Sequence, residues 1–124
     1  MKQESREHFD AAEEFIREAE LLASGGFCRG TVARAYYAMF HAATAALLER
    51  DIERGSHHGI IAAFGQRLVK TGEIPKQFHA YLQKAFEARM EVDYETTASL
   101  TLQEARIVIE RARAFVDVCR QLSG

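Results

Sequence analysis

The fold is decided by the stretch VARAYYAMFHAATAALL, which spans residues 32–48. This alanine-rich run favours a helix, and it is apolar almost all the way round, with Arg34 and His41 as its only basic side chains. Surface helices normally carry polar residues along one side. We therefore expect both sides of this helix to be covered.

The two sides of this predicted helix differ in chemistry. A helical wheel places a mainly apolar set on one side, namely Val32, Tyr36, Met39, Phe40, Ala43 and Leu47. The opposite side holds a guanidinium, a phenol and an imidazole next to a leucine, which are Arg34, Tyr37, His41 and Leu48. A chain of this size can bury one side in its own core, so we expect the second side to meet another subunit or a partner.

Amphipathic patterns predict further helices around this run. Residues 5–23 form a helix with the apolar stripe Phe9, Ala12, Ile16, Ala19 and Ala23, and the turn at residues 24–26 ends it. The central helix covers residues 27–51. Ser56 is the expected N-cap of a short third helix, which Gly72 ends and whose apolar positions are Ile60, Ile61, Phe64 and Leu68.

The second half of the chain predicts two more helices. One opens at Pro75 and carries Phe78, Leu82, Ala85 and Arg89 on one side, and residues 93–100 have the composition of an irregular connection. Thr101 and Glu104 match a capping box that starts a last helix, which runs to about residue 122 and buries Leu102, Ala105, Ile109, Ala112, Val116 and Cys119. Since no segment has strand periodicity, we predict an all-α fold, an antiparallel up-and-down four-helix bundle with an additional short helix.

Composition indicates a globular protein, which we expect in the cytoplasm. Of its 124 residues 48% are hydrophobic and 27% charged, without a membrane-spanning apolar run or a signal-peptide pattern. The 16 Lys and Arg against 18 Asp and Glu give a net charge of -2, which argues against a general binder of phosphate backbones. Cys28 and Cys119 lack CxxC spacing, so we expect free thiols and no zinc site or disulfide.

Arg34 and His41 are the first candidates for chemistry. They lie two helical turns apart, about 10 Å along the axis, with Tyr37 between them. A histidine moves protons near neutral pH and an arginine binds a phosphate with a planar fork, so the pair suits phosphodiester chemistry or nucleotide binding. A plainer alternative is structural, with His41 as an interface residue and Arg34 paired with a carboxylate across the bundle.

Arg89 is a second charge expected on an apolar side. It shares that side of the fourth helix with the apolar residues, so it needs a partner, and Asp93 one turn later is the local candidate for an ion pair. Tyr94 follows directly. If the second and fourth helices are neighbours, one groove would collect Arg34, His41, Arg89, Asp93 and Tyr94.

Other enzyme classes lack sequence support. No histidine has a glutamate three residues before it, as a di-iron carboxylate bundle requires, and no P-loop, dinucleotide-binding glycine pattern or nucleophile elbow is present. His57 and His58 could be exposed ligands, but no metal-type spacing accompanies them, and we interpret them as helix-capping residues. We expect neither a cofactor nor a metal.

Several segments together resemble the HEPN domain family, the higher-eukaryote and prokaryote nucleotide-binding helical domains. The run ARAYYAMFHAA at residues 33–43 is similar to the family's signature helix. The small stand-alone branch is resembled, in the same order, by residues 56–60, Phe64, residues 68–74 and residues 89–94. The likeness covers nearly the whole chain, so it implies one HEPN-like helical domain over residues 1–124.

This resemblance also implies partners and an activity. Such bundles dimerise and are often encoded beside a minimal nucleotidyltransferase, and some are metal-independent ribonucleases of toxin–antitoxin or defence systems. Arg34 and His41 match the upper limit of the arginine-to-histidine spacing in those nucleases, where His41 would be the general acid or base and Arg34 would stabilise charge on the phosphate. Residues 89–94 hold no histidine, in contrast to the motif of the better-known toxin branch.

Three hypotheses follow. In the first, the chain is a homodimeric module, joined through its second helix, that acts with a minimal nucleotidyltransferase and binds nucleotide or RNA in a groove formed by Arg34, Tyr37, His41, Arg89, Asp93 and Tyr94. In the second, it is a metal-independent endoribonuclease toxin with Arg34 and His41 as catalytic residues. In the third, it is a purely structural oligomerisation module.

Overall fold

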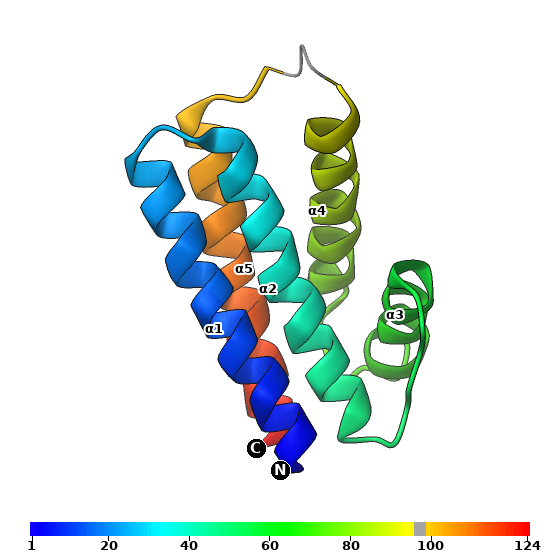
Figure 1. Cartoon of the computed structure of the whole chain (residues 1–124). Coiled ribbons are helices and arrows are strands. Elements are labelled where there is room, and N and C mark those ends of the chain that lie inside the picture. Colours follow the sequence, from blue (N-terminus) through cyan, green and yellow to red (C-terminus); the bar gives the residue numbers. More distant parts are fainter. Residues whose placement is uncertain (96–98) are drawn as a thin grey trace.

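The protein is a bundle of four long helices with a short helical segment at one end. Figure 1 shows a computed structural model, which describes residues 1–95 and 99–124. Its elements are α1 (Gln3–Ser24), α2 (Cys28–Leu48), α3 (His57–Phe64), the π-helical η1 (Gly65–Val69), α4 (Lys76–Tyr94) and α5 (Leu102–Ser123). The long helices alternate in direction and both termini lie at the same end (Figure 1). The predicted all-α bundle with an additional short helix is confirmed.

Helix α2 is the central element. It contacts α1, α3, α4 and α5, whereas α4 and α5 touch each other much less. Small side chains allow this crowding, because Ala35, Ala38, Ala42 and Ala45 on α2 are completely buried. The predicted stripe of α1 is likewise buried. The cost of ordering the chain is therefore offset mainly by apolar packing around one helix.

The second side of α2 is covered in part by its own chain. We expected another subunit to cover Arg34, Tyr37 and His41, but α1 already packs beside all three side chains and leaves only the rest of their surface for a second subunit. They are half-buried, and only Leu48 on that side is buried. The reason is that α1 packs along α2. The apolar stripe of α1 points into the core, and the side chains next to that stripe contact the second side of α2.

Three local expectations were wrong. Leu102 is 42% exposed, because as the first residue of α5 it lies beyond the packed part of the bundle. Phe40 is half-buried instead of buried. Helix α4 continues through Tyr94, so residues 93 and 94 are helical, while residues 96–98 of the predicted irregular connection lie outside the described residues.

The helix starts follow the predicted capping residues. Ser56 caps α3, since its Oγ accepts from the Gly59 N–H at 3.0 Å. At α5 the Thr101 Oγ1 accepts from the Glu104 N–H at 3.1 Å, and the Thr101 N–H donates to the Glu104 carboxylate at 3.3 Å. Both predicted caps are confirmed.

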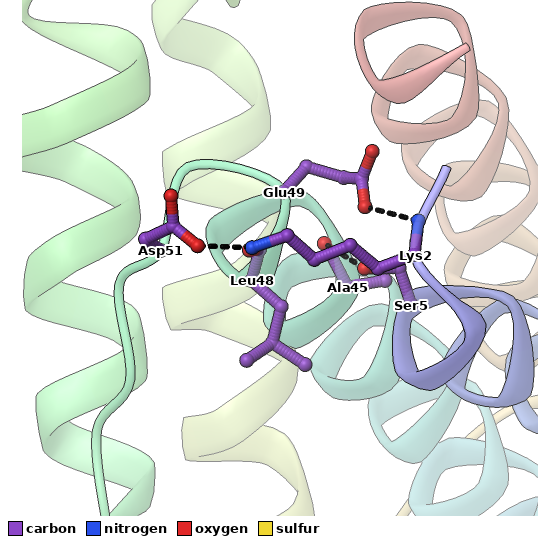
Figure 2. Close-up of polar contacts among 6 residues, drawn as sticks. All are labelled: Lys2, Ser5, Ala45, Leu48, Glu49 and Asp51. Atoms are coloured by element: carbon purple, nitrogen blue, oxygen red, sulfur yellow. Dashed lines mark hydrogen bonds and ion pairs between the residues drawn. The ribbon is translucent and has the colours of Figure 1, made fainter.

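A polar clamp ties the start of α1 to the end of α2 (Figure 2). The Lys2 ammonium donates to the Leu48 carbonyl at 2.9 Å and pairs with Asp51, while the Lys2 N–H donates to Glu49 at 2.8 Å. The hydroxyl of Ser5, which is completely buried, donates to the Ala45 carbonyl at 3.3 Å. A cation on the last carbonyls of a helix also complements its dipole. The clamp sets the register of α1 along α2. It therefore also fixes the position of the α1 side chains that lie one turn after Ser5.

Among the described residues, no helix combines the length and the apolar character needed to cross a bilayer.

Candidate functional site

Half-buried aromatic rings form a continuous band across four helices. Neighbouring rings have centroids 4.4–6.1 Å apart, running from α1 over α2 to α3 and α4. All are partly accessible to solvent. We call this set the aromatic band, and it consists of His8, Phe15, Tyr37, Phe40, His41, His57 and Phe86.

Two guanidinium groups flank one ring of the band. The Cζ of Arg34 lies 5.9 Å from the ring centroid of Tyr37, and the Cζ of Arg89 lies 5.5 Å from it. Both distances are within the range of cation–π attraction. Helices α2 and α4 thus bring Arg34, Tyr37 and Arg89 together, as the predicted groove requires.

Each of these arginines has a carboxylate partner. The Arg34 Nε is 3.1 Å from the Glu18 Oε1, and the Arg89 Nε is 3.0 Å from the Asp93 Oδ2. The predicted pair of Arg89 with Asp93 is confirmed, and so is a carboxylate for Arg34. Because partly exposed ion pairs contribute about 0–1 kcal/mol, an incoming phosphate could displace Glu18 from Arg34 at small cost, whereas the Nε of Arg89 is buried.

His41 sits among rings of α1 and α2. Its Nδ1 is 2.9 Å from the Nδ1 of His8, its ring stacks on Phe15 at 5.5 Å, and the Phe40 ring meets it edge-on at 5.8 Å. Burial, followed by the charge of His8, lowers the pKa of His41 below its usual value. The imidazole is therefore mainly neutral at pH 7, which suits either a proton acceptor or a neutral hydrogen-bond donor.

His57 belongs to the same face, which corrects its predicted capping role. Ser56 caps α3, whereas the His57 ring stacks on Phe40 at 4.4 Å and its Nδ1 lies 2.6 Å from the Tyr36 hydroxyl oxygen. Burial is the main cause that lowers the pKa of His57, followed by Arg89 and His58. His58 is exposed and meets Phe86 edge-on at 5.1 Å. The face thus has two imidazoles of lowered proton affinity, His41 and His57.

The predicted site residues are not all part of this face. Arg34, Tyr37 and Arg89 lie together with Asp93, and His41 follows Tyr37 by one turn of α2. Tyr94 ends α4 with 77% of its surface exposed, so it is not packed against them. The groove predicted from the sequence did not include the other half of the band, His8, Phe15, His57 and Phe86. The spacing of seven between His8 and Phe15 was the available signal, because it places both on one side of the first helix.

The remaining features of the described residues do not belong to the aromatic band. A cavity of about 340 Å³ opens between α4 and α5, floored by Val32 and Met39 on the opposite side of α2. Within residues 1–95 and 99–124, no three His, Cys, Asp or Glu side chains gather closely enough to hold a metal ion. Cys28 and Cys119 are free thiols.

Comparison with known proteins agrees with the geometry of this bundle. The HEPN domain matches residues 5–122. A protein of Methanocaldococcus jannaschii that is named as a candidate toxin is 36% identical over 94% of this chain and 87% of its own length. A UPF0332 protein of Gloeobacter violaceus is 33% identical over 98% of this chain and 97% of its own length, and one of Thermotoga maritima is 31% identical over 90% and 84%.

Proposed function

Because this chain belongs to the HEPN domain family, we propose that it is the toxin-like member of a toxin–antitoxin or defence-type pair. In this proposal it forms a homodimer through α2, binds nucleotide or RNA on the face that holds the aromatic band, and acts with a minimal nucleotidyltransferase. The observation that carries the proposal is the band itself with its two flanking arginines. Seven neighbouring rings that each keep part of their surface accessible form a surface that a partner or a ligand can cover.

The chemistry of the band suits both a protein and an RNA partner. Aromatic side chains and arginines are enriched at interfaces between subunits. Unpaired bases of RNA stack on aromatic rings, and guanidinium groups bind phosphates with paired hydrogen bonds. If a two-fold axis passes beside α2, each dimer brings two copies of Arg34 and His41 to one cleft.

The dimer is tested by placing a charge on the accessible side of α2. Thr44 lies one turn beyond His41 on that side, is half-buried, and takes no part in ring packing. We expect Thr44→Arg to convert a dimer into a monomer in sedimentation velocity, with an unchanged circular dichroism spectrum. Leu21→Arg, at a site of α1 that is 75% exposed, is the matched control and should stay dimeric. A wild-type protein that sediments as a monomer at all concentrations would refute this part.

RNA binding is tested by fluorescence anisotropy with short single-stranded RNAs and with nucleotides. Arg34→Ala and Tyr37→Ala should weaken binding, while Arg106→Ala on the exposed side of α5 should not. Co-purification with a minimal nucleotidyltransferase, where a neighbouring gene encodes one, tests the pairing. Absence of binding together with absence of co-purification would remove the support for this proposal. Under the structural hypothesis, His41→Ala weakens association and changes little else.

A second candidate function is metal-independent RNA cleavage. It is favoured by the relatives that are named as candidate toxins and by a neutral imidazole two turns from a guanidinium. His41 would take the proton of the ribose 2′-hydroxyl while Arg34 stabilises the charge on the phosphate. Purified protein should then cut RNA in EDTA, and His41→Ala should abolish cutting and keep the dimer. Intact RNA after prolonged incubation would exclude this function.

A further inference from the structure

His8 on α1 and His41 on α2 face each other through the same ring atom. Their Nδ1 atoms are 2.9 Å apart, and their ring centroids are 5.1 Å apart with planes inclined by 30°. That separation is typical of a hydrogen bond, so one Nδ1 carries a proton and the other accepts it. His8 therefore engages the Nδ1 of His41, so that Nε2 is the ring nitrogen of His41 that is left for another contact.

The surrounding structure holds both rings in place. Phe15 and Phe40 pack against His41 from two directions. On the α1 side, Ser5 lies one turn before His8 and is bonded to the Ala45 carbonyl within the polar clamp. The Nδ1–Nδ1 contact is thus a consequence of how α1 is fixed on α2, not a chance approach of two mobile side chains.

The shared hydrogen bond limits how many protons the pair can hold. In the neutral pair, the Nδ1–H of one ring donates to the Nδ1 of the other, whose own proton is on Nε2. One additional proton turns the donor ring into an imidazolium and leaves the bond intact. A second additional proton would put N–H groups on both facing atoms and break it. The bonded pair therefore carries at most one positive charge.

Several charged or titratable groups face this pair. The Arg34–Glu18 ion pair lies along the α1–α2 contact, and α4 brings Arg89 to the ring of Tyr37. From α3, His57 stacks on Phe40, which also contacts His41. A cavity of about 210 Å³ next to His8 is lined by further charges, Glu4, Glu53 and Arg54. Burial and the charge of His8 both lower the pKa of His41, in agreement with a pair that resists a second charge.

We propose that His8 is a positioning residue of this site: it engages Nδ1 of His41, directs Nε2 of His41 to the ligand, and shares a single proton with it. A protonated Nε2 donates to a phosphate oxygen. A bare Nε2 accepts a proton from a hydroxyl, after which the Nδ1–H of the His41 imidazolium donates to His8 and the pair shares the charge. This inference rests on the proposed RNA-binding face and adds to it a residue outside the arginine–histidine motif.

The titration of His41 tests the pairing without any ligand. Long-range 1H–15N spectra of the imidazoles, recorded from pH 5 to pH 8, should show His41 following two steps at least about one pH unit apart. His8→Phe keeps a ring and removes both nitrogens, so His41 should then titrate in one step. His8→Gln also removes the coupling but retains a group that can bond Nδ1. His58→Phe, which removes an exposed histidine, should leave both steps unchanged.

RNA binding across the same pH range tests the consequence. Affinity of the wild type for a short single-stranded RNA should rise as the pair takes up its one proton, and His8→Phe should lose this pH dependence. If no variant binds or cuts RNA while the two-step titration is present, the proposed function fails and the pairing stands. A single-step titration in the wild type, with an unchanged pH profile in His8→Phe, would overturn the role of His8 and leave RNA binding intact.

Discussion

Tyr36 combines complete burial with a polar group that needs a partner. Its hydroxyl oxygen lies 2.6 Å from the Nδ1 of His57, which joins the middle of α2 to the first residue of α3. Burial raises the pKa of Tyr36 far above its usual value, so the hydroxyl stays protonated at any physiological pH. The pair therefore fixes His57 within the band while it fixes α3 on the bundle.

Removal of this hydroxyl should be measurable. We expect Tyr36→Phe to lower the free energy of unfolding by about 1–2 kcal/mol, because a buried hydrogen bond is lost and the His57 Nδ1 is left without its partner. Urea unfolding followed by circular dichroism gives the value. Tyr37→Phe, one position along α2 and half-buried, is the matched control and should change stability less. Equal effects of both substitutions would contradict the importance of the Tyr36–His57 bond.

Glu18 forms an ion pair with the Arg34 guanidinium, which binds a phosphate in the proposed function. Glu18→Gln removes this competition and a negative charge, so we expect tighter binding of short RNA. An ion pair of this exposure is worth at most about 1 kcal/mol, which corresponds to a gain of up to about fivefold in affinity. Anisotropy titrations at low and high salt give the affinity. Glu14→Gln, at an exposed position of the same helix, controls for net charge alone, and the same gain there would contradict the specific competition.

At the scale of helices, Gly65 shows how one element makes room for another. It begins the π-helical segment η1 with ordinary right-handed helical angles, so it is not required by backbone conformation. A Cβ at this position would lie 2.7 Å from the Nε2 of His79, which is 3.1 Å from the Ile61 carbonyl. Glycine here accommodates the close approach of α4.

This packing predicts that Gly65→Ala changes the stability in opposite directions in the wild type and in a His79→Ala variant. Alanine is favoured over glycine in a helix by about 1 kcal/mol, yet Gly65→Ala should destabilise the protein, because it displaces His79 from its carbonyl. In a His79→Ala background the obstacle is gone, and Gly65→Ala should stabilise by up to about 1 kcal/mol. A double-mutant cycle of urea unfolding measures the coupling. Additive effects would show that the two residues do not interact.

The same elements show what could be predicted from the sequence. The helices and most of their buried stripes follow from local periodicity, and the starts at Ser56 and Thr101 follow from cap chemistry. The π-helical turn did not, because the spacing of Phe64 and Leu68 fits one helical turn of either kind. Half of the aromatic band was missed for a related reason. Whether His8 contacts His41 depends on how α1 is turned about its own axis where it packs on α2. A helical wheel of one helix does not contain that information.

At the scale of the molecule, the central position of α2 connects the core with the proposed site. Its apolar side packs into the bundle, and its other side supplies Arg34, Tyr37 and His41 to the proposed site, around which α1, α3 and α4 each contact α2. Local packing in the core therefore determines the geometry of the site. Any substitution that shifts α1, such as one that opens the polar clamp at Lys2, should also move His8 relative to His41.

The two half-buried histidines also make overall stability depend on pH. Burial is the main cause that lowers the pKa of both His41 and His57 below the value of 6.5 expected in the unfolded chain. Between the lowered pKa and 6.5 the unfolded chain therefore binds more protons than the folded one, so acid favours unfolding. The stabilisation is fully present above pH 6.5 and is lost as the pH falls below it.

We expect the free energy of unfolding to decrease as the pH is lowered from 7 to 5. Each histidine contributes at most about 1.4 kcal/mol per pH unit, and solvent screening of these partly exposed side chains reduces that value. The slope is measured by urea unfolding at intervals of half a pH unit. This pH range lies above the one in which Glu49 and Glu73 begin to titrate, because hydrogen bonds lower the pKa values of both carboxyl groups. The double variant His41→Gln/His57→Gln should flatten it, whereas His79→Gln should not. A slope of the same size in the double variant would mean that protons taken up elsewhere control the acid stability of this bundle.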